Sequence, residues 1–256
     1  MRVVALHRDV LVATSAVWQT TCTLLRGGDE GFVVDSPVLP DELDALPAVL
    51  EQAGFPVSGL LATHADWDHL LARTAFPGAA LGVAETTAAR LTGSIGAAQR
   101  ELRAFDERWY VRRERPLSLG QLQALPVPGK LEIGGDGVEL ELHPADGHTA
   151  DGMAIWAPSP RVLVCGDYVS PVEIPMISDG GSRDGYVATL EHLAPLIDAA
   201  DVVVPGHGEP LDGGRASAIL REDLEYMRAL PDAPLPLARR GAAQQEIHAA
   251  NVNRVS

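Results

Sequence analysis

The stretch Thr-His-Ala-Asp-Trp-Asp-His, residues 63–69, directly follows an apolar run that is predicted as a buried strand over residues 57–62. It places four potential metal ligands within six positions, namely His64, Asp66, Asp68 and His69. So short a loop cannot bury all four side chains against apolar neighbours, and two carboxylates beside two imidazoles perturb one another unless a cation neutralises them. The stretch therefore predicts a metal site at the end of this strand.

Three more candidate ligands follow β-type segments in the second half of the chain. His148 lies in Asp-Gly-His-Thr, Asp167 in Val-Leu-Val-Cys-Gly-Asp, and His207 in Val-Val-Val-Pro-Gly-His-Gly. A neighbouring glycine permits a tight turn, so each side chain can point into a shared cleft at one edge of the sheets. The seven ligands come from four separate segments and are enough for two metal ions.

This pattern resembles the metallo-β-lactamase superfamily, whose signature is HxHxDH followed by separated His, Asp and His. The resemblance spans roughly residues 1–230 and implies an α/β (α+β) fold, a four-layer αβ/βα sandwich with the metals in a groove at the sheet edge. Residues 231–256 are expected as a C-terminal tail that packs on this domain or extends from it. Position by position, the resemblance implies a first metal site of His64, Asp66 and His148, a second of Asp68, His69 and His207, and Asp167 as the bridging carboxylate.

Asp66 departs from the family pattern, because most members carry His at this position. A third ligand carboxylate, beside Asp68 and Asp167, makes bound water less acidic and favours harder metals such as iron or manganese relative to zinc. Flavodiiron proteins of the same superfamily carry Glu here and hold iron, whereas Asp is shorter than either Glu or His. Two divalent ions are therefore expected as cofactors, with zinc as the first expectation, iron or manganese as alternatives, and the occupancy of the first site left open.

The metal chemistry implies a hydrolase. A bound dication lowers the pKa of water from ~15.7 towards ~7, so a metal-bound hydroxide is expected to cleave a small ester, thioester, lactone or phosphoester. Asp68 is expected to orient or deprotonate the nucleophile, with a plain ligand role as the alternative. Two other functions remain open: a di-iron redox or oxygen-handling protein, and a non-catalytic metal-binding module. The sequence defines no substrate-binding residue, and the expected partner is a small-molecule substrate.

Composition narrows the function classes. The chain has 20 Lys and Arg against 35 Asp and Glu, a formal net charge of −15, which repels polyanions and argues against a nucleic-acid partner. Uninterrupted apolar runs of membrane-spanning length are lacking, and the first residues lack the layout of a secretory signal, so a cytoplasmic protein without membrane attachment is expected. Cys22 and Cys165 are too few and too far apart for a disulfide framework or a cysteine-based metal cage.

The remaining pattern predicts two sheet-rich halves separated by helices. Strands over residues 10–14, 20–25 and 31–34 are expected to form an antiparallel meander. A long helical region over residues 85–113, with Leu102, Phe105 and Trp109 on one stripe, is expected as an amphipathic surface helix, with a lid or a homodimer contact as the alternative. Asp35 is either a turn cap or, by the resemblance, a buried residue near the metal groove. Glu173 is one of several candidates to border that groove.

Overall fold

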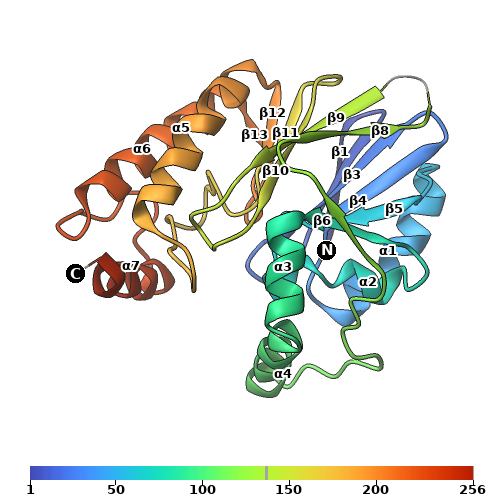
Figure 1. Ribbon diagram of the computed structural model, residues 1–256, viewed down its shortest axis with the longest axis horizontal. Helices are drawn as coiled ribbons and strands as arrows, with labels where there is room; N and C mark the ends of the chain where they lie inside the picture. Colours follow the sequence, from blue (N-terminus) through green and yellow to red (C-terminus); the bar gives the residue numbers. More distant parts are fainter. Residues whose placement is uncertain (136–137, 256) are drawn as a thin grey trace.

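The computed structural model describes residues 1–135 and 138–255, which form two β-sheets packed face to face (Figure 1). The first sheet has seven strands in the order β1 (Arg2–His7), β2 (Val10–Thr14), β3 (Thr21–Gly27), β4 (Glu30–Asp35), β5 (Gly59–Leu61), β6 (Leu81–Ala84) and β7 (Leu122–Leu125). The second has six strands in the order β13 (Leu211–Asp212), β12 (Val202–Val204), β11 (Val162–Val164), β10 (Met153–Ala157), β9 (Val138–Pro144) and β8 (Gly129–Ile133).

Helices cover the outer face of each sheet, which gives four layers (Figure 1). The first sheet carries α1 (Pro40–Ala53), α2 (Ala72–Ala75), α3 (Glu85–Gly93) and α4 (Ala97–Trp109). The second carries α5 (Arg183–Ala199), α6 (Gly213–Ala229) and α7 (Ala242–Val255). Three clusters of buried apolar side chains separate the four layers: one lies between the sheets and one lies under each group of helices. The predicted four-layer αβ/βα sandwich is therefore confirmed.

Strand directions bring the ends of several strands to one edge of the sandwich. Strands β1 to β4 pair antiparallel, as the predicted meander requires, whereas β4, β5, β6 and β7 pair in parallel. In the second sheet β11 and β12 are parallel, so the segments that follow them leave the sheet on the same side. Two backbone hydrogen bonds join the sheets at this edge, from Met153 to the Thr63 carbonyl at 2.7 Å and from Thr21 to the Gly206 carbonyl at 2.8 Å.

The predicted helices differ from the observed ones in three places. Residues 68–74, for which the sequence also predicts a helix, instead form a 3₁₀ turn, Trp67–His69, followed by the short α2. The helical region over residues 85–113 is broken into α3 and α4, because Gly96 begins α4 in a left-handed conformation with φ of 78°. Leu102 and Phe105 of the expected stripe are buried, whereas Trp109, the last residue of α4, is 58% exposed. Helix α6 was not predicted.

The C-terminal segment packs against the second helical layer and continues its apolar core. Ile247, Val252 and Val255 of α7 contact the buried cluster under α5 and α6. The Asn251 side chain accepts a hydrogen bond from the Ile177 backbone at 2.9 Å and donates one to the Pro175 carbonyl at 2.7 Å. Residue 256 of the predicted tail lies outside the described residues. None of the helices in the described part of the chain is long and apolar enough to cross a membrane.

Candidate metal centre

Asp35, the last residue of β4, holds the segment 63–69 in place through contacts with Thr63 and His69. The two Asp35 carboxylate oxygens accept hydrogen bonds from the Thr63 backbone at 2.8 Å and from the Thr63 hydroxyl at 2.9 Å. Asp35 Oδ2 also lies 3.0 Å from His69 Nδ1, and the Asp35 side chain is 1% exposed. A carboxylate on Nδ1 sets the orientation of the ring and leaves Nε2 free to bind a metal ion. Asp35 is therefore a buried residue that orients the site and not merely a turn cap.

Four side chains from three segments form a first cluster. His64 Nε2 and His148 Nε2 lie 3.8 Å and 3.4 Å from Asp167 Oδ2. The Oδ2 atom of Asp66 is 3.7 Å from His64 Nε2 and 3.5 Å from His148 Nε2. The ligand atoms of His64, His148 and Asp167 all lie within 4.8 Å of one another. These separations suit atoms that surround a single cation.

A second cluster shares Asp167. His207 Nε2 lies 3.4 Å from Asp167 Oδ2, and His69 Nε2 lies 3.2 Å from Asp167 Oδ1. Asp68 Oδ2 is 3.7 Å from His69 Nε2 and 3.6 Å from His207 Nε2. Ligand atoms of Asp68, His69 and His207 form a group within 4.8 Å. Since Asp167 contacts both clusters, its carboxylate stands where a residue that bridges two ions is required.

The atoms that face the two clusters are buried and lack hydrogen-bond partners among the described residues. They are His64 Nε2, His69 Nε2, His148 Nε2 and Asp167 Oδ1. Buried polar atoms without partners are rare in folded proteins, and several of them aimed at one place indicate a ligand that satisfies them. Imidazole nitrogen and carboxylate oxygen are the donors that zinc, iron and manganese accept. The residues present therefore fit two divalent cations.

In the metal-free protein, the pKa values of the imidazoles show that the carboxylates of the site require positive charge beside them. Burial lowers the pKa of His148, but the carboxylates of Asp66 and Asp167 outweigh it and raise that pKa to about 9. Burial likewise lowers the pKa of His207, and Asp167 and Glu173 raise it to about 10. Without cations, the carboxylates are therefore compensated by protonated imidazoles. Metal ions must displace these protons when they bind.

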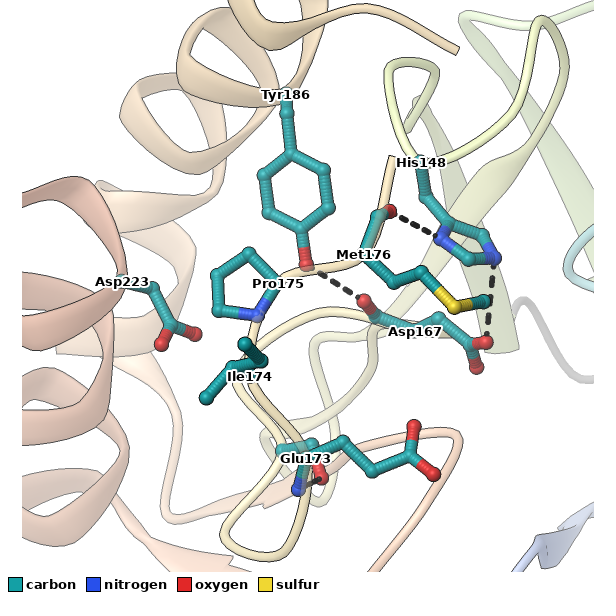
Figure 2. Close-up of a pocket in the computed structure, with 9 residues that line it drawn as sticks. His148, Asp167, Glu173, Ile174, Pro175, Met176, Tyr186 and Asp223 are labelled. Carbon is teal, nitrogen blue, oxygen red and sulfur yellow. Dashed lines mark hydrogen bonds and ion pairs between the residues drawn. The ribbon is translucent and has the colours of Figure 1, made fainter. Parts of the chain in front are cut away.

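Backbone groups fix the far nitrogens of the imidazoles in each cluster. His148 Nδ1 lies 2.7 Å from the Met176 carbonyl oxygen, and His207 Nδ1 lies 3.2 Å from the Trp18 carbonyl oxygen. The Tyr186 hydroxyl donates a 2.8 Å hydrogen bond to the Asp167 carbonyl oxygen. Figure 2 shows the Tyr186 hydroxyl on the Asp167 carbonyl and the Met176 carbonyl on His148, whose other ring nitrogen faces the Asp167 carboxylate. A contact to one ring nitrogen sets the tautomer and leaves Nε2 as the metal-binding atom.

Glycines next to the predicted ligands allow the close approach of the loops. Gly147 has a φ of 121°, and a Cβ atom there would collide with the backbone of Tyr186. A Cβ atom on Gly206 would collide with Asp167 Oδ1. Both positions therefore require glycine, as the sequence pattern indicated.

Asp66, the residue that departs from the family pattern, has a cationic partner. Arg90 of α3 donates from Nη2 to Asp66 Oδ1 at 2.8 Å and from Nη1 to Asp151 Oδ1 at 2.8 Å. Neither Arg90 nor Asp151 was a candidate from the sequence, because they stand 24 and 85 positions from Asp66 without a motif around them. A single charged residue far away in the sequence does not by itself identify a partner of Asp66.

Four more residues with side chains capable of chemistry lie near the ligands in the sequence. Cys165 is a buried core thiol, as expected, whose Sγ contacts the Tyr168 carbonyl at 3.2 Å. The His143 side chain contacts His192 and Glu141: its Nδ1 lies 3.3 Å from His192 Nε2, and its Nε2 lies 3.5 Å from Glu141 Oε2. Asp146 is exposed, so a role behind the ligands is excluded for it. Glu173 lines the same small cavity as His148 and Asp167, where its carboxylate extends away from Asp223 (Figure 2).

Comparison with known proteins identifies the fold and the family. A model of the metallo-beta-lactamase superfamily matches residues 16–207. Two proteins called metallo-beta-lactamase type 2, from Bacillus sp. (strain 170) and Bacillus cereus, are each 32% identical to this chain over 100 residues. The matched segment is 38% of this chain and 37% of each relative, so the chain matches little more than a third of their length.

Solved structures share the four-layer architecture. A metallo-beta-lactamase family protein from Thermus thermophilus has a TM-score of 0.67 at 22% identity, over 88% of this chain and 81% of that one. A metallo-beta-lactamase from Pontibacter korlensis has a TM-score of 0.65 at 17% identity, over 89% of this chain and 98% of that one. A double mutant of a sec-alkyl sulfatase has a TM-score of 0.69 at 15% identity, over 90% of this chain and 42% of that one. Because the family model spans most of the chain, the protein belongs to the metallo-β-lactamase superfamily.

Proposed function

We propose that the protein is a metal-dependent hydrolase with two divalent ions. His64, Asp66 and His148 would hold the first ion, Asp68, His69 and His207 the second, and Asp167 would bridge them. The observation that carries the proposal is the set of buried, partnerless Nε2 atoms of His64, His69 and His148 that converge on the Asp167 carboxylate. Family membership supports metal-dependent hydrolysis as the reaction class.

Two bound divalent ions would lower the pKa of water and polarise the bond that is cleaved. The remaining work falls to side chains of the protein. Asp68 Oδ2 faces His69 and His207, and a carboxylate in this position can also accept a hydrogen bond from the attacking water. Asp68 is 7% exposed, so its orientation is held by the surrounding packing. We assign to it the orientation of the nucleophile.

Glu173 is suited to the proton transfer that completes hydrolysis. Burial raises the pKa of its carboxyl group; His207 and His148 lower it, the carboxylates of Asp167 and Asp68 raise it, and the net effect is a rise. The Glu173 backbone is fixed by hydrogen bonds to the Ser170 hydroxyl at 2.9 Å and from Arg239 Nη1 at 2.8 Å. A protonated carboxyl group beside the site can donate its proton to the leaving group.

Few basic side chains in the described part of the chain lie near the centre. Among the ion pairs of the described residues, Arg90 is the one arginine or lysine that contacts a predicted ligand, and two carboxylates already occupy it. Lys130, the only lysine of the sequence, is exposed and pairs with Glu139. An anionic group of a substrate would therefore be bound by the two metal ions and not by basic side chains. The substrate candidates are small esters, thioesters, lactones and phosphoesters.

The test combines metal analysis with a substrate panel. The protein is loaded separately with zinc, manganese or iron(II), and its metal content is measured by elemental analysis. Hydrolysis is then followed with p-nitrophenyl acetate, an acyl thioester, a γ-lactone and bis(p-nitrophenyl) phosphate. We expect turnover of at least one acyl substrate that a chelator abolishes and added metal restores. Protein that holds two ions and cleaves none of these substrates would contradict the proposal.

A di-iron redox protein is the second candidate, because three carboxylates, Asp66, Asp68 and Asp167, face the two clusters. Carboxylate-rich sites favour harder metals. Iron retained after purification, together with oxygen consumption in the presence of a reductant, would support this candidate over hydrolysis. A non-catalytic metal-binding module would hold its ions and show neither activity.

A further inference from the structure

Arg90 ties together the two segments that carry the first predicted metal site. Its Nη2 donates to Asp66 in the segment 63–69, and its Nη1 donates to Asp151 in the segment that carries His148. The Asp151 carboxylate also reaches back to the first segment, since its Oδ2 accepts a hydrogen bond from the Ala65 backbone at 3.0 Å. Asp151 is 1% exposed and Arg90 is 27% exposed, so the bridge is largely shielded from water.

With this bridge in place, the two oxygens of the Asp66 carboxylate have different partners. Oδ1 is engaged by Arg90, and Oδ2 faces His64 and His148. A free aspartate side chain could rotate about its last bond and exchange these oxygens, whereas a bond from a planar guanidinium fixes one orientation. The Asp66 side chain is thereby held with one oxygen towards the predicted ion.

The bridge also explains how an aspartate can stand at a position that favours histidine. A carboxylate adds a negative charge to the first cluster, and the Arg90 guanidinium lies directly behind it. Asp66 is therefore an anion with a cation on each side once a metal ion is bound.

We propose that Arg90 is a positioning residue that makes Asp66 a ligand of the first metal ion. The inference rests on the proposed two-ion centre, but it concerns metal affinity and not turnover. The inference predicts that Arg90 affects metal affinity only when residue 66 is aspartate. With histidine at position 66, the metal site has no carboxylate oxygen at that position for Arg90 to hold.

The test is a double-mutant cycle on metal affinity. Wild type, Arg90→Ala, Asp66→His and the double variant are loaded with zinc, and the dissociation constants of both ions are measured by competition with a chromophoric chelator. Removing a residue behind a metal ligand typically weakens metal binding by about 10–100-fold. We expect Arg90→Ala to weaken the first ion by at least about tenfold and to leave the second unchanged. In the Asp66→His background the same substitution should change the affinity by less than about threefold.

Two further variants serve as controls. One tests whether the planar guanidinium of Arg90 matters beyond its charge, and the other tests whether loss of any surface arginine changes metal affinity. Arg90→Lys keeps the charge but cannot hold two carboxylates in one plane, so we expect a loss of affinity between those of wild type and Arg90→Ala. Arg100→Ala, which removes an exposed arginine of α4 that bonds the Ile95 carbonyl, should leave both affinities at the wild-type value. Arg90→Lys carries the comparison if Arg90→Ala does not fold, as judged by circular dichroism and thermal melting.

The outcomes distinguish this inference from the proposed function. Equal affinity of wild type and Arg90→Ala for the first ion would overturn it, as would an equal loss in the aspartate and histidine backgrounds. A lower melting temperature with unchanged metal affinity would assign Arg90 to the packing of α3 alone and would also overturn it. A wild-type protein that binds no ion would instead contradict the two-ion centre.

Discussion

Arg239 Nη1 donates a 2.8 Å hydrogen bond to the carbonyl oxygen of Glu173, which joins the C-terminal segment to the loop that borders the predicted metal centre. The Nη2 atom of Arg239 lies 2.7 Å from Asp223 Oδ1, and both side chains are 1% exposed. Because Arg239 contacts both Asp223 and the loop that carries Glu173, the C-terminal segment contributes to the shape of the site. The arrangement connects the segment before the last helix, α7, to the candidate proton donor.

Arg239→Ala should destabilise the protein strongly. The substitution leaves Asp223 buried without its partner, and breaking a buried pair in this way costs about 3–5 kcal/mol. Equilibrium unfolding in urea measures the loss. The neighbouring exposed arginine provides the control, since Arg240→Ala should stay within about 0.5 kcal/mol of wild type. Equal unfolding free energies for the two variants would contradict the importance of the pair.

Glu173→Gln should lower kcat on an acyl substrate by about a hundredfold or more, because the amide cannot donate a proton. Since the protonated form acts, wild-type kcat should fall at high pH as Glu173 loses its proton, and the variant should lack that dependence. Metal content should not change. Glu225→Gln on the exposed face of α6 is the matched control. A variant with wild-type kcat and the same pH profile would exclude Glu173 as the acid.

His69→Ala and Asp167→Ala should each abolish turnover and leave the fold largely intact, because each removes a predicted ligand from the edge of the sheets and not from the apolar core. Their far-ultraviolet circular dichroism should match that of wild type. His192→Ala and Asp146→Ala alter the same residue types outside the clusters and should retain full activity. Activity that survives in either ligand variant would refute the role assigned to that residue.

The metal-free protein should lose stability as the pH rises. The pKa values of His148 and His207 are raised in the folded state, to about 9 and about 10, above the 6.5 of an unperturbed imidazole. Their contribution to stability is therefore fully present below pH 6.5 and is lost as the pH rises through the folded-state values. Melting temperatures of chelator-treated protein should fall between pH 6.5 and about 9. A rising melting temperature over that interval would contradict the charge balance of the site.

The antiparallel meander near the N-terminus and the convergence of the loops could be predicted from the sequence because they depend on local signals. Apolar runs such as residues 202–204 end at Gly-His or Gly-Asp pairs, and parallel strands bring such ends to one edge. Helix α6 was missed because its buried residues, including Asp223 and Tyr226, do not form a purely apolar stripe. The break after Gly93 was hidden because helical residues continue on both sides of it.

The partners of the ligands could not be predicted, because nothing in the sequence links them. Arg90 reaches Asp66 only through the packing of α3 beside the segment 63–69, and Asp151 reaches Ala65 across the two sheets. Arg239 finds Asp223 and Glu173 through the return of the C-terminal segment. Such contacts depend on tertiary structure, whereas the ligands themselves follow from short motifs.

The most direct test is a crystal structure of metal-loaded protein with the ions located by anomalous scattering. Two peaks about 3.5–4 Å apart are expected, the first bound by His64, Asp66 and His148, the second by Asp68, His69 and His207, with Asp167 between them. Loaded crystals in which these side chains point apart, or in which the two clusters lack anomalous density, would contradict the two-ion centre.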